Sequence, residues 1–177
     1  MKKLLQSLLV LTLTIGLSSY AYAQTDSDQI TATATVEASV DVQSVQGLDF
    51  GTLSAGGSSD IATTDAGAGQ FTVKGNSGSV DLSFSFGNGG ELVAQDNGDG
   101  NDGANIPITF DDSDAAYGPD ASTQDDTWNP ESETATVDVA ADSDQTIYVF
   151  IGGSISAPAG QVAGTYTETI TLTATHN

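Results

Sequence analysis

The sequence of 177 residues contains no cysteine, one histidine and only three lysine or arginine residues. Without cysteine the fold has neither disulfides nor thiolate metal sites, and a zinc site would lack its usual ligands. Lys2 and Lys3 lie at the N-terminus, which leaves Lys74 as the only lysine or arginine in a remainder that carries all 24 acidic residues. Nucleic acids and anionic lipid headgroups are bound through cationic side chains, so this composition excludes nucleic-acid binding.

The net charge of −21 at pH 7 also leaves the carboxylates without partners for salt bridges. Their mutual repulsion has to be relieved by screening salt or by bound cations. Two interpretations remain open: a halophilic protein from a saline habitat, or an exported protein that acidity keeps in solution.

The N-terminus has the pattern of a secretory signal peptide. The basic pair Lys2 and Lys3 precedes an apolar run from Leu4 to Leu17 and the small-x-small triplet Ala21-Tyr22-Ala23. This run is shorter than the roughly 20 residues that a membrane-spanning helix needs. We therefore expect residues 1–23 to be cleaved and the remainder to be exported to the cell surface, the medium or the periplasm, without membrane insertion.

Period-two alternation dominates residues 24–177, and no segment has a helical period. Apolar and polar residues alternate over 30–42, 80–86, 106–110, 135–139 and 166–174. Segments 48–53 and 70–74 predict two further strands, and 147–151 is apolar on both faces, which predicts a central strand. Eight or nine short strands predict one all-β domain over 24–177, an immunoglobulin-like antiparallel β-sandwich, with a barrel as the alternative.

Two acidic segments interrupt this pattern. The first is a turn whose oxygen-bearing side chains are of the kind that calcium binds: Asp96, Asn97, Asp99, Asn101 and Asp102. Its spacing does not match an EF-hand, so a looser calcium site and a hydrated turn remain the two interpretations. No other cofactor is predicted.

The second acidic segment, residues 111–132, is predicted to be a long loop. It carries Tyr117 and Trp128 among several aspartates. These two rings could stack on sugars while the carboxylates accept hydroxyl hydrogen bonds, or Trp128 could cover the core beneath the loop.

Two motifs carry a resemblance to a known family. The alternating segment 32–36 leads to Leu48-Asp49-Phe50-Gly51-Thr52-Leu53, and Ala163-Gly164-Thr165-Tyr166 leads into the last alternating segment. Together they resemble DUF4402, a secreted bacterial domain of unknown function, and more distantly the spore-coat U and chaperone–usher pilin subunits. The resemblance covers nearly all of residues 24–177. It implies an immunoglobulin-like sandwich outside the cytoplasm, although the paired cysteines of the pilins are missing.

These observations predict an exported, non-enzymatic structural or adhesive surface protein, such as a fimbria-like or coat subunit. Its partners would be copies of itself or other surface proteins. In the expected mechanism the last strand, residues 166–175, leaves one sheet edge open. A neighbour adds residues 24–35 there as a donor strand, and Ile30, Ala32 and Ala34 enter the acceptor groove.

Two alternatives stay open. One is a secreted carbohydrate- or matrix-binding module that uses Tyr117 and Trp128. The other is a secreted glycoside hydrolase with two carboxylates, although no motif singles out a pair among the 24 acids. The lone His176 lies next to the C-terminal residue, where a catalytic triad is not expected, so the chain is not predicted to be an enzyme.

Overall fold

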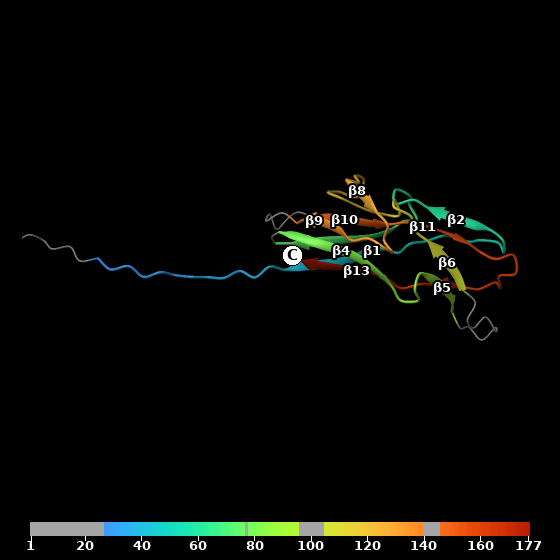
Figure 1. Cartoon of the computed structure of the whole chain (residues 1–177), viewed down its shortest axis with the longest axis horizontal. Coiled ribbons are helices and arrows are strands. Elements are labelled where there is room, and N and C mark those ends of the chain that lie inside the picture. The colour runs from blue at the N-terminus through green and yellow to red at the C-terminus, as the bar shows by residue number, and fades with distance from the viewer. Residues whose placement is uncertain (1–26, 77, 96–104, 140–145) are drawn as a thin grey trace, which may run out of the picture. The chain divides into compact units, whose positions relative to one another are not determined.

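The computed structural model describes residues 27–76, 78–95, 105–139 and 146–177 (Figure 1). The chain divides into two units, which meet between Thr35 and Val36. In the first unit, residues 27–35 are exposed and form no helix or strand. The predicted signal peptide and the predicted calcium turn lie outside the described residues. Across the described ranges, no helix has the length and apolar character required to span a bilayer.

The second unit is built from antiparallel β-strands. The described residues form thirteen strands and no helix: β1 (Val40–Gln46), β2 (Ser58–Ile61), β3 (Gly69–Gly75), β4 (Ser79–Phe86), β5 (Glu91–Ala94), β6 (Asn105–Thr109), β7 (Ala115–Gly118), β8 (Asp126–Trp128), β9 (Ala135–Asp138), β10 (Thr146–Ile151), β11 (Gly153–Ser156), β12 (Tyr166–Thr167) and β13 (Ile170–His176). The first sheet has the order β1-β3-β10-β7-β8, the second β12-β5-β6-β11-β2 and the third β13-β4-β9.

The first and third sheets enclose one hydrophobic core. Val73 and Val149 of the first sheet belong to the same buried cluster as Leu82 and Leu172 of the third. The threonines that alternate with Leu172 in β13 are exposed, as in a sheet with one face on the core and one in solvent. This stacking confirms the predicted all-β antiparallel sandwich.

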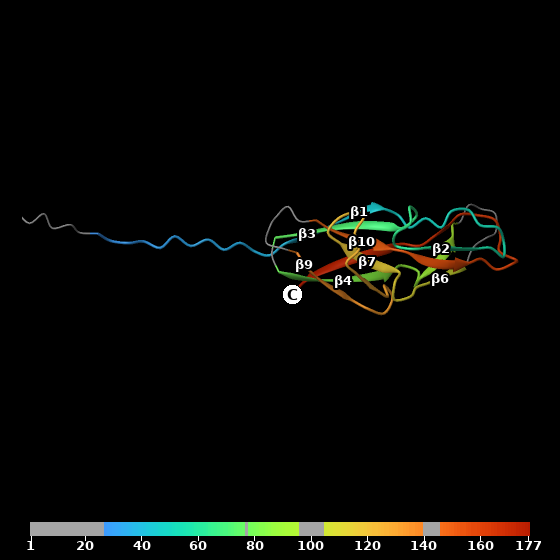
Figure 2. The same ribbon diagram turned by 90° about the horizontal axis from the view of Figure 1, so that it is seen from above.

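A second buried cluster packs against the second sheet and contains Ile106, Ile108 and Ile155. In both views β2 and β6 lie at one end of the second unit, and β4 and β9 lie at the other (Figures 1 and 2). The two cores therefore follow each other along the sandwich.

The chain passes from the first sheet to the second at Gly152, between β10 and β11. A Cβ atom at Gly152 would lie 2.1 Å from the carbonyl oxygen of Ile61, which is too close for any side chain. The next residue, Gly153, has a φ of 141°, a conformation that glycine alone adopts readily. The glycine pair thus allows one continuous segment to serve both sheets.

The predicted strand over residues 30–42 is wrong in its first part. Strand β1 begins only at Val40, where β3 supplies a partner through Gly75, and residues 30–39 form no strand. Apolar alternation alone did not suffice, because a strand is stabilised by its neighbours in the sheet.

The predicted strand over 48–53 is also absent. The amide of Asp49 donates to the carbonyl oxygen of Gly67 at 2.8 Å, and Gly51 has a φ of 73°, so the backbone turns here. Phe50 and Leu53 are half-buried and pack against the second core. Residues 48–53 therefore form a turn that is half-buried through these two side chains.

The segment 111–132 is not the loop that was predicted. It contains β7 and β8, which pair with each other, and β7 also pairs with β10. The hairpin extends the first sheet and leaves β10 in its centre, as the apolar pattern of 147–151 predicted.

Candidate strand-addition site

Tyr117 and Trp128, the predicted sugar-binding pair, lie in the first core. Trp128 is 4% exposed, and its ring stacks on Phe84 with centroids 6.0 Å apart. Tyr117 is half-buried, with its ring 6.1 Å from that of Trp128. Burial, together with the charges of Asp126, Asp125 and Asp138, raises the pKa of Tyr117. This placement is the core-packing alternative for Trp128, since a buried indole offers no face to a sugar.

The acidic residues 111–114 form a turn through their own hydrogen bonds. The amide of Asp111 donates to Oδ2 of Asp114 at 2.7 Å, and the Ser113 amide donates to Oδ1 of Asp111 at 2.7 Å. The Ser113 hydroxyl and amide both lower the pKa of Asp111. Across the described ranges, no three acidic or histidine side chains are grouped closely enough to hold a metal ion. Since Asp96 and its neighbours are outside those ranges, their calcium site stays a prediction.

The predicted donor residues belong to the exposed segment that precedes β1. Ile30 is 97% exposed and Val36 is 85% exposed, and Ala32 and Ala34 between them are exposed as well. These four residues alternate with polar ones. The apolar residues thus form an exposed row along one side of the segment, which makes it a candidate surface for a partner.

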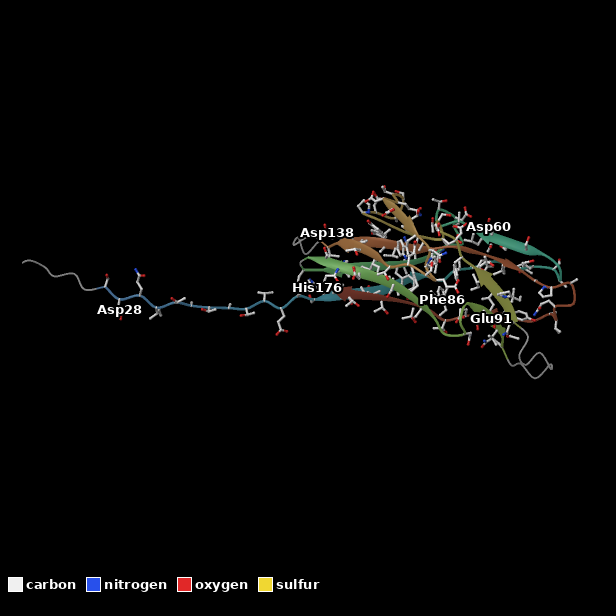
Figure 3. The ribbon with its side chains drawn as sticks, in the orientation of Figure 1. Asp28, Asp60, Phe86, Glu91, Asp138 and His176 are labelled. Carbon is white, nitrogen blue, oxygen red and sulfur yellow. The ribbon has the colours of Figure 1, made fainter. Side chains whose placement is uncertain are left out.

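Among the edge strands of the three sheets in the described residues, β1 and β13 are the candidates for such a partner. In the described part of the chain, β1 pairs only with β3, and β13 pairs only with β4. β1 and β13 are also in contact, so the edges of the two layers lie next to each other. Figure 3 labels His176, where β13 ends, and Asp138 in β9 at the same end of the third sheet. Such edges present backbone N–H and C=O groups that an added strand can pair with.

A groove of about 460 Å³ opens where these edges meet. One wall is formed by residues 44–48 at the end of β1. The other is formed by residues 166–170, from β12 to the first residue of β13. Its lining includes Phe71, Ile108 and Ile151, which belong to or pack against the two cores. We call this site the edge groove.

Hydrogen bonds hold both walls of the edge groove in place. On the first wall, Nε2 of Gln46 donates to the carbonyl oxygens of Ala66 at 2.6 Å and Ala68 at 3.0 Å. On the second wall, the Tyr166 hydroxyl donates to the carbonyl oxygen of Val162 at 2.6 Å. The carboxylate of Glu168 accepts from the Asn88 amide at 2.9 and 3.0 Å. The groove is thus formed before any partner arrives, which lowers the entropic cost of binding.

The donor residues and the open edge of the last strand stay predictions from the sequence, whereas the groove beside that edge was not predicted. The walls come from the ends of β1 and β13, which are more than 100 residues apart in the chain. The one local signal is Val45, an apolar residue that is 57% exposed and lines the edge groove.

No family model matches the sequence, and no curated protein matches it either. Among solved structures, the chain is similar to a protein chain in the structure described as "Chaperone-tip adhesin complex is vital for synergistic activation of CFA/I fimbriae biogenesis". The identity is 16% and the TM-score 0.45, over 78% of this chain and 41% of that one. This chain thus spans less than half of the length of that structure. The likeness concerns the fold alone, and membership of DUF4402 stays a prediction.

Proposed function

We propose that this chain is an exported, non-enzymatic subunit of a surface assembly, related to DUF4402, in which each copy donates a strand to the next. The observation that carries the proposal is the combination, in one chain, of an exposed alternating segment and an unfilled edge groove. Residues 30–36 would span about 23 Å as a strand, and β13 is also seven residues long. Donor and acceptor therefore match in length.

The chemistry of the two partners also matches. An added strand would pair its backbone with β1 or β13, and the apolar side chains of Ile30, Ala32, Ala34 and Val36 would face the lining of the groove. The threonines at 31, 33 and 35 would then face solvent, like those of β13. Addition removes exposed Ile30 and Val36 from water at the same step.

The first experiment compares residues 24–177 with residues 37–177, which lack the donor segment, by size-exclusion chromatography and electron microscopy. We expect the longer chain to form oligomers or filaments and the shorter chain to stay monomeric. A labelled peptide of residues 28–37 should bind the shorter chain. Equal assembly of both chains would overturn the proposal. So would a monomeric longer chain whose amides at 30–36 are protected from exchange, because the segment would then pair within its own chain.

Matched pairs of variants test the apolar face of the donor segment and the lining of the edge groove. Ile30→Asp places a charge on the face that enters the groove and should abolish assembly, whereas Thr31→Asp on the opposite face should leave it intact. On the acceptor, Val45→Asp should block peptide binding. Ser156→Asp is the control, because Ser156 is exposed and does not line the groove. Equal effects within either pair would contradict the mechanism.

Export is tested separately. The mature protein from the native cell should begin at Gln24, and N-terminal sequencing or intact mass measures this. A mature chain that retains residues 1–23 would contradict cleavage, while leaving the strand-addition experiments to stand on their own.

A further inference from the structure

A second hollow, of about 470 Å³, opens on the outer face of the first sheet. Ile147 and Val149 of β10 point into the first core, so Phe150, the residue after Val149, lies on the opposite face of the sheet. Phe150 pairs with Gln70 of β3, and Gln70 pairs with Gln46 of β1, which places these three residues side by side across the sheet. They line the bottom of the hollow, which we call the face pocket.

The walls of the face pocket are two loops that are hydrogen-bonded to each other. One loop, residues 62–68, connects β2 to β3, and the other, residues 119–125, connects β7 to β8. Thr63, a hydroxyl residue only 6% exposed, donates from Oγ1 to Oε1 of Gln124 at 3.0 Å across the pocket. The bonds from Gln46 to Ala66 and Ala68 fix the first loop to the sheet.

The second loop is fixed by Asp120. Its Oδ1 accepts from the amide and the hydroxyl of Ser122, both at 2.8 Å, and its Oδ2 accepts from the Thr123 hydroxyl at 3.0 Å. These bonds lower the pKa of Asp120 and keep it ionised. At Gly118 a Cβ atom would lie 1.7 Å from the Thr123 carbonyl oxygen, so the loop returns directly over β7. A pocket whose walls are fixed in this way has little left to order when a ligand binds.

Several polar groups that line the face pocket have no partner among the described residues. They are both ends of the Gln70 side-chain amide, Nε2 of Gln124, Oε1 of Gln46 and Oδ1 of Asp65. Donors and acceptors of both kinds therefore surround the edge of a buried aromatic ring. Vicinal hydroxyls of a sugar match such amide and carboxylate groups, which can donate and accept several hydrogen bonds at once.

Charge narrows the ligand class further. Among the described residues that line the pocket there is no lysine or arginine, whereas Asp65 is one of them. Lys74 lies on the same face of β3 as Gln70 but four residues further along, about 13 Å away. Phosphate, sulfate and carboxylate ligands would meet repulsion without a compensating charge. We infer that the face pocket binds a neutral saccharide.

The test uses residues 24–177 on an array of neutral and acidic glycans, followed by NMR titration with the neutral sugars that bind. We expect neutral saccharides to bind and to shift the side-chain amide signals of Gln70 and Gln124. Gln70→Ala and Gln124→Ala should each weaken binding about tenfold, since each removes one or two hydrogen bonds to the ligand. Gln43→Ala is the control, because Gln43 lies on the same sheet, bonds Asp41 and does not line the pocket.

Three results would overturn the inference: no neutral glycan binds, acidic glycans bind better than neutral ones, or Gln70→Ala and Gln43→Ala weaken binding equally. Capture of peptides in place of sugars would overturn it as well. Sugar binding at the face pocket does not depend on strand addition. Residues 37–177 contain the whole face pocket and should bind the same sugars even if they no longer assemble.

Discussion

At the scale of single residues, the fold depends on how closely the backbone approaches itself at Gly152. Alanine there would place its Cβ 2.1 Å from the Ile61 carbonyl oxygen, an atom of the backbone that cannot rotate away. We expect Gly152→Ala to lower the free energy of unfolding by about 3 kcal/mol or more. Urea unfolding measures this. Gly47→Ala is the control: a Cβ atom there has nothing within 4 Å, and its effect should stay within about 1 kcal/mol.

Asp114 should make the free energy of unfolding depend on pH. It is 9% exposed, and burial raises its pKa above 3.8, although the hydrogen bond from the Asp111 amide partly offsets this; the charges of Asp111 and Asp60 add to the rise. Because the pKa is higher in the folded state, ionised Asp114 lowers stability at neutral pH. That loss disappears as the pH falls through the folded-state pKa toward 3.8.

We therefore expect Asp114→Asn to stabilise the protein at pH 7, since the asparagine oxygen still accepts from the Asp111 amide. The gain should shrink toward zero as the pH approaches 3.8, as measured by urea unfolding across this range. Asp112→Asn removes the same charge from an exposed neighbour and reports the effect of general repulsion. A gain that is equal for both variants, or independent of pH, would contradict the role of burial.

At the scale of elements, Tyr166 connects the turn before β12 to the second core. Its ring packs against that core and its hydroxyl bonds the Val162 carbonyl. Tyr166→Phe keeps the ring and removes the bond, so we expect a loss of about 1 kcal/mol in unfolding free energy. Tyr148→Phe should change little, because the Tyr148 hydroxyl has no partner among the described residues. Equal losses would show that the hydroxyl bond contributes nothing.

Strands with a clear apolar face could be predicted from the sequence. The alternation of Val80, Leu82, Phe84 and Phe86 matches β4, and the buried run 147–151 matches β10. β2, β5, β7, β8 and β11 were missed because each has three or four residues, several of them small or acidic, and is held by pairing with its neighbours. Propensity alone cannot report such pairing.

The candidate sites divide in the same way. The alternation of the predicted donor residues is visible in the sequence, because they lie in one continuous stretch. It predicts both an internal strand over 30–42 and a donor strand over 24–35, since the sequence does not show which strands have a partner. The edge groove and the face pocket are each assembled from segments far apart in the chain. Nothing local marks Gln70 and Gln124 as lining one pocket, since Gln70 is placed by strand pairing and Gln124 lies in a loop that bonds Thr63.

At the scale of the whole molecule, carboxylate repulsion should govern stability. The chain carries 24 acidic residues and three basic ones. The screening length falls from about 30 Å in 0.01 M salt to about 3 Å in 1 M salt, so repulsion between separated carboxylates is largely removed. We expect the melting temperature of residues 24–177 to rise by about 5 °C or more over this range in NaCl, or about 1–2 kcal/mol for a domain of this size.

Calcium chloride at matched ionic strength separates screening from binding. If screening alone acts, the melting temperatures in the two salts should coincide at each ionic strength, because the screening length is then the same. A calcium site at residues 96–102, as the sequence predicts, would add a gain in melting temperature that saturates at low millimolar calcium and disappears in Asp99→Asn. A melting temperature that does not change with either salt would contradict the repulsion itself, since it would mean that the carboxylates lie too far apart in the folded chain to interact.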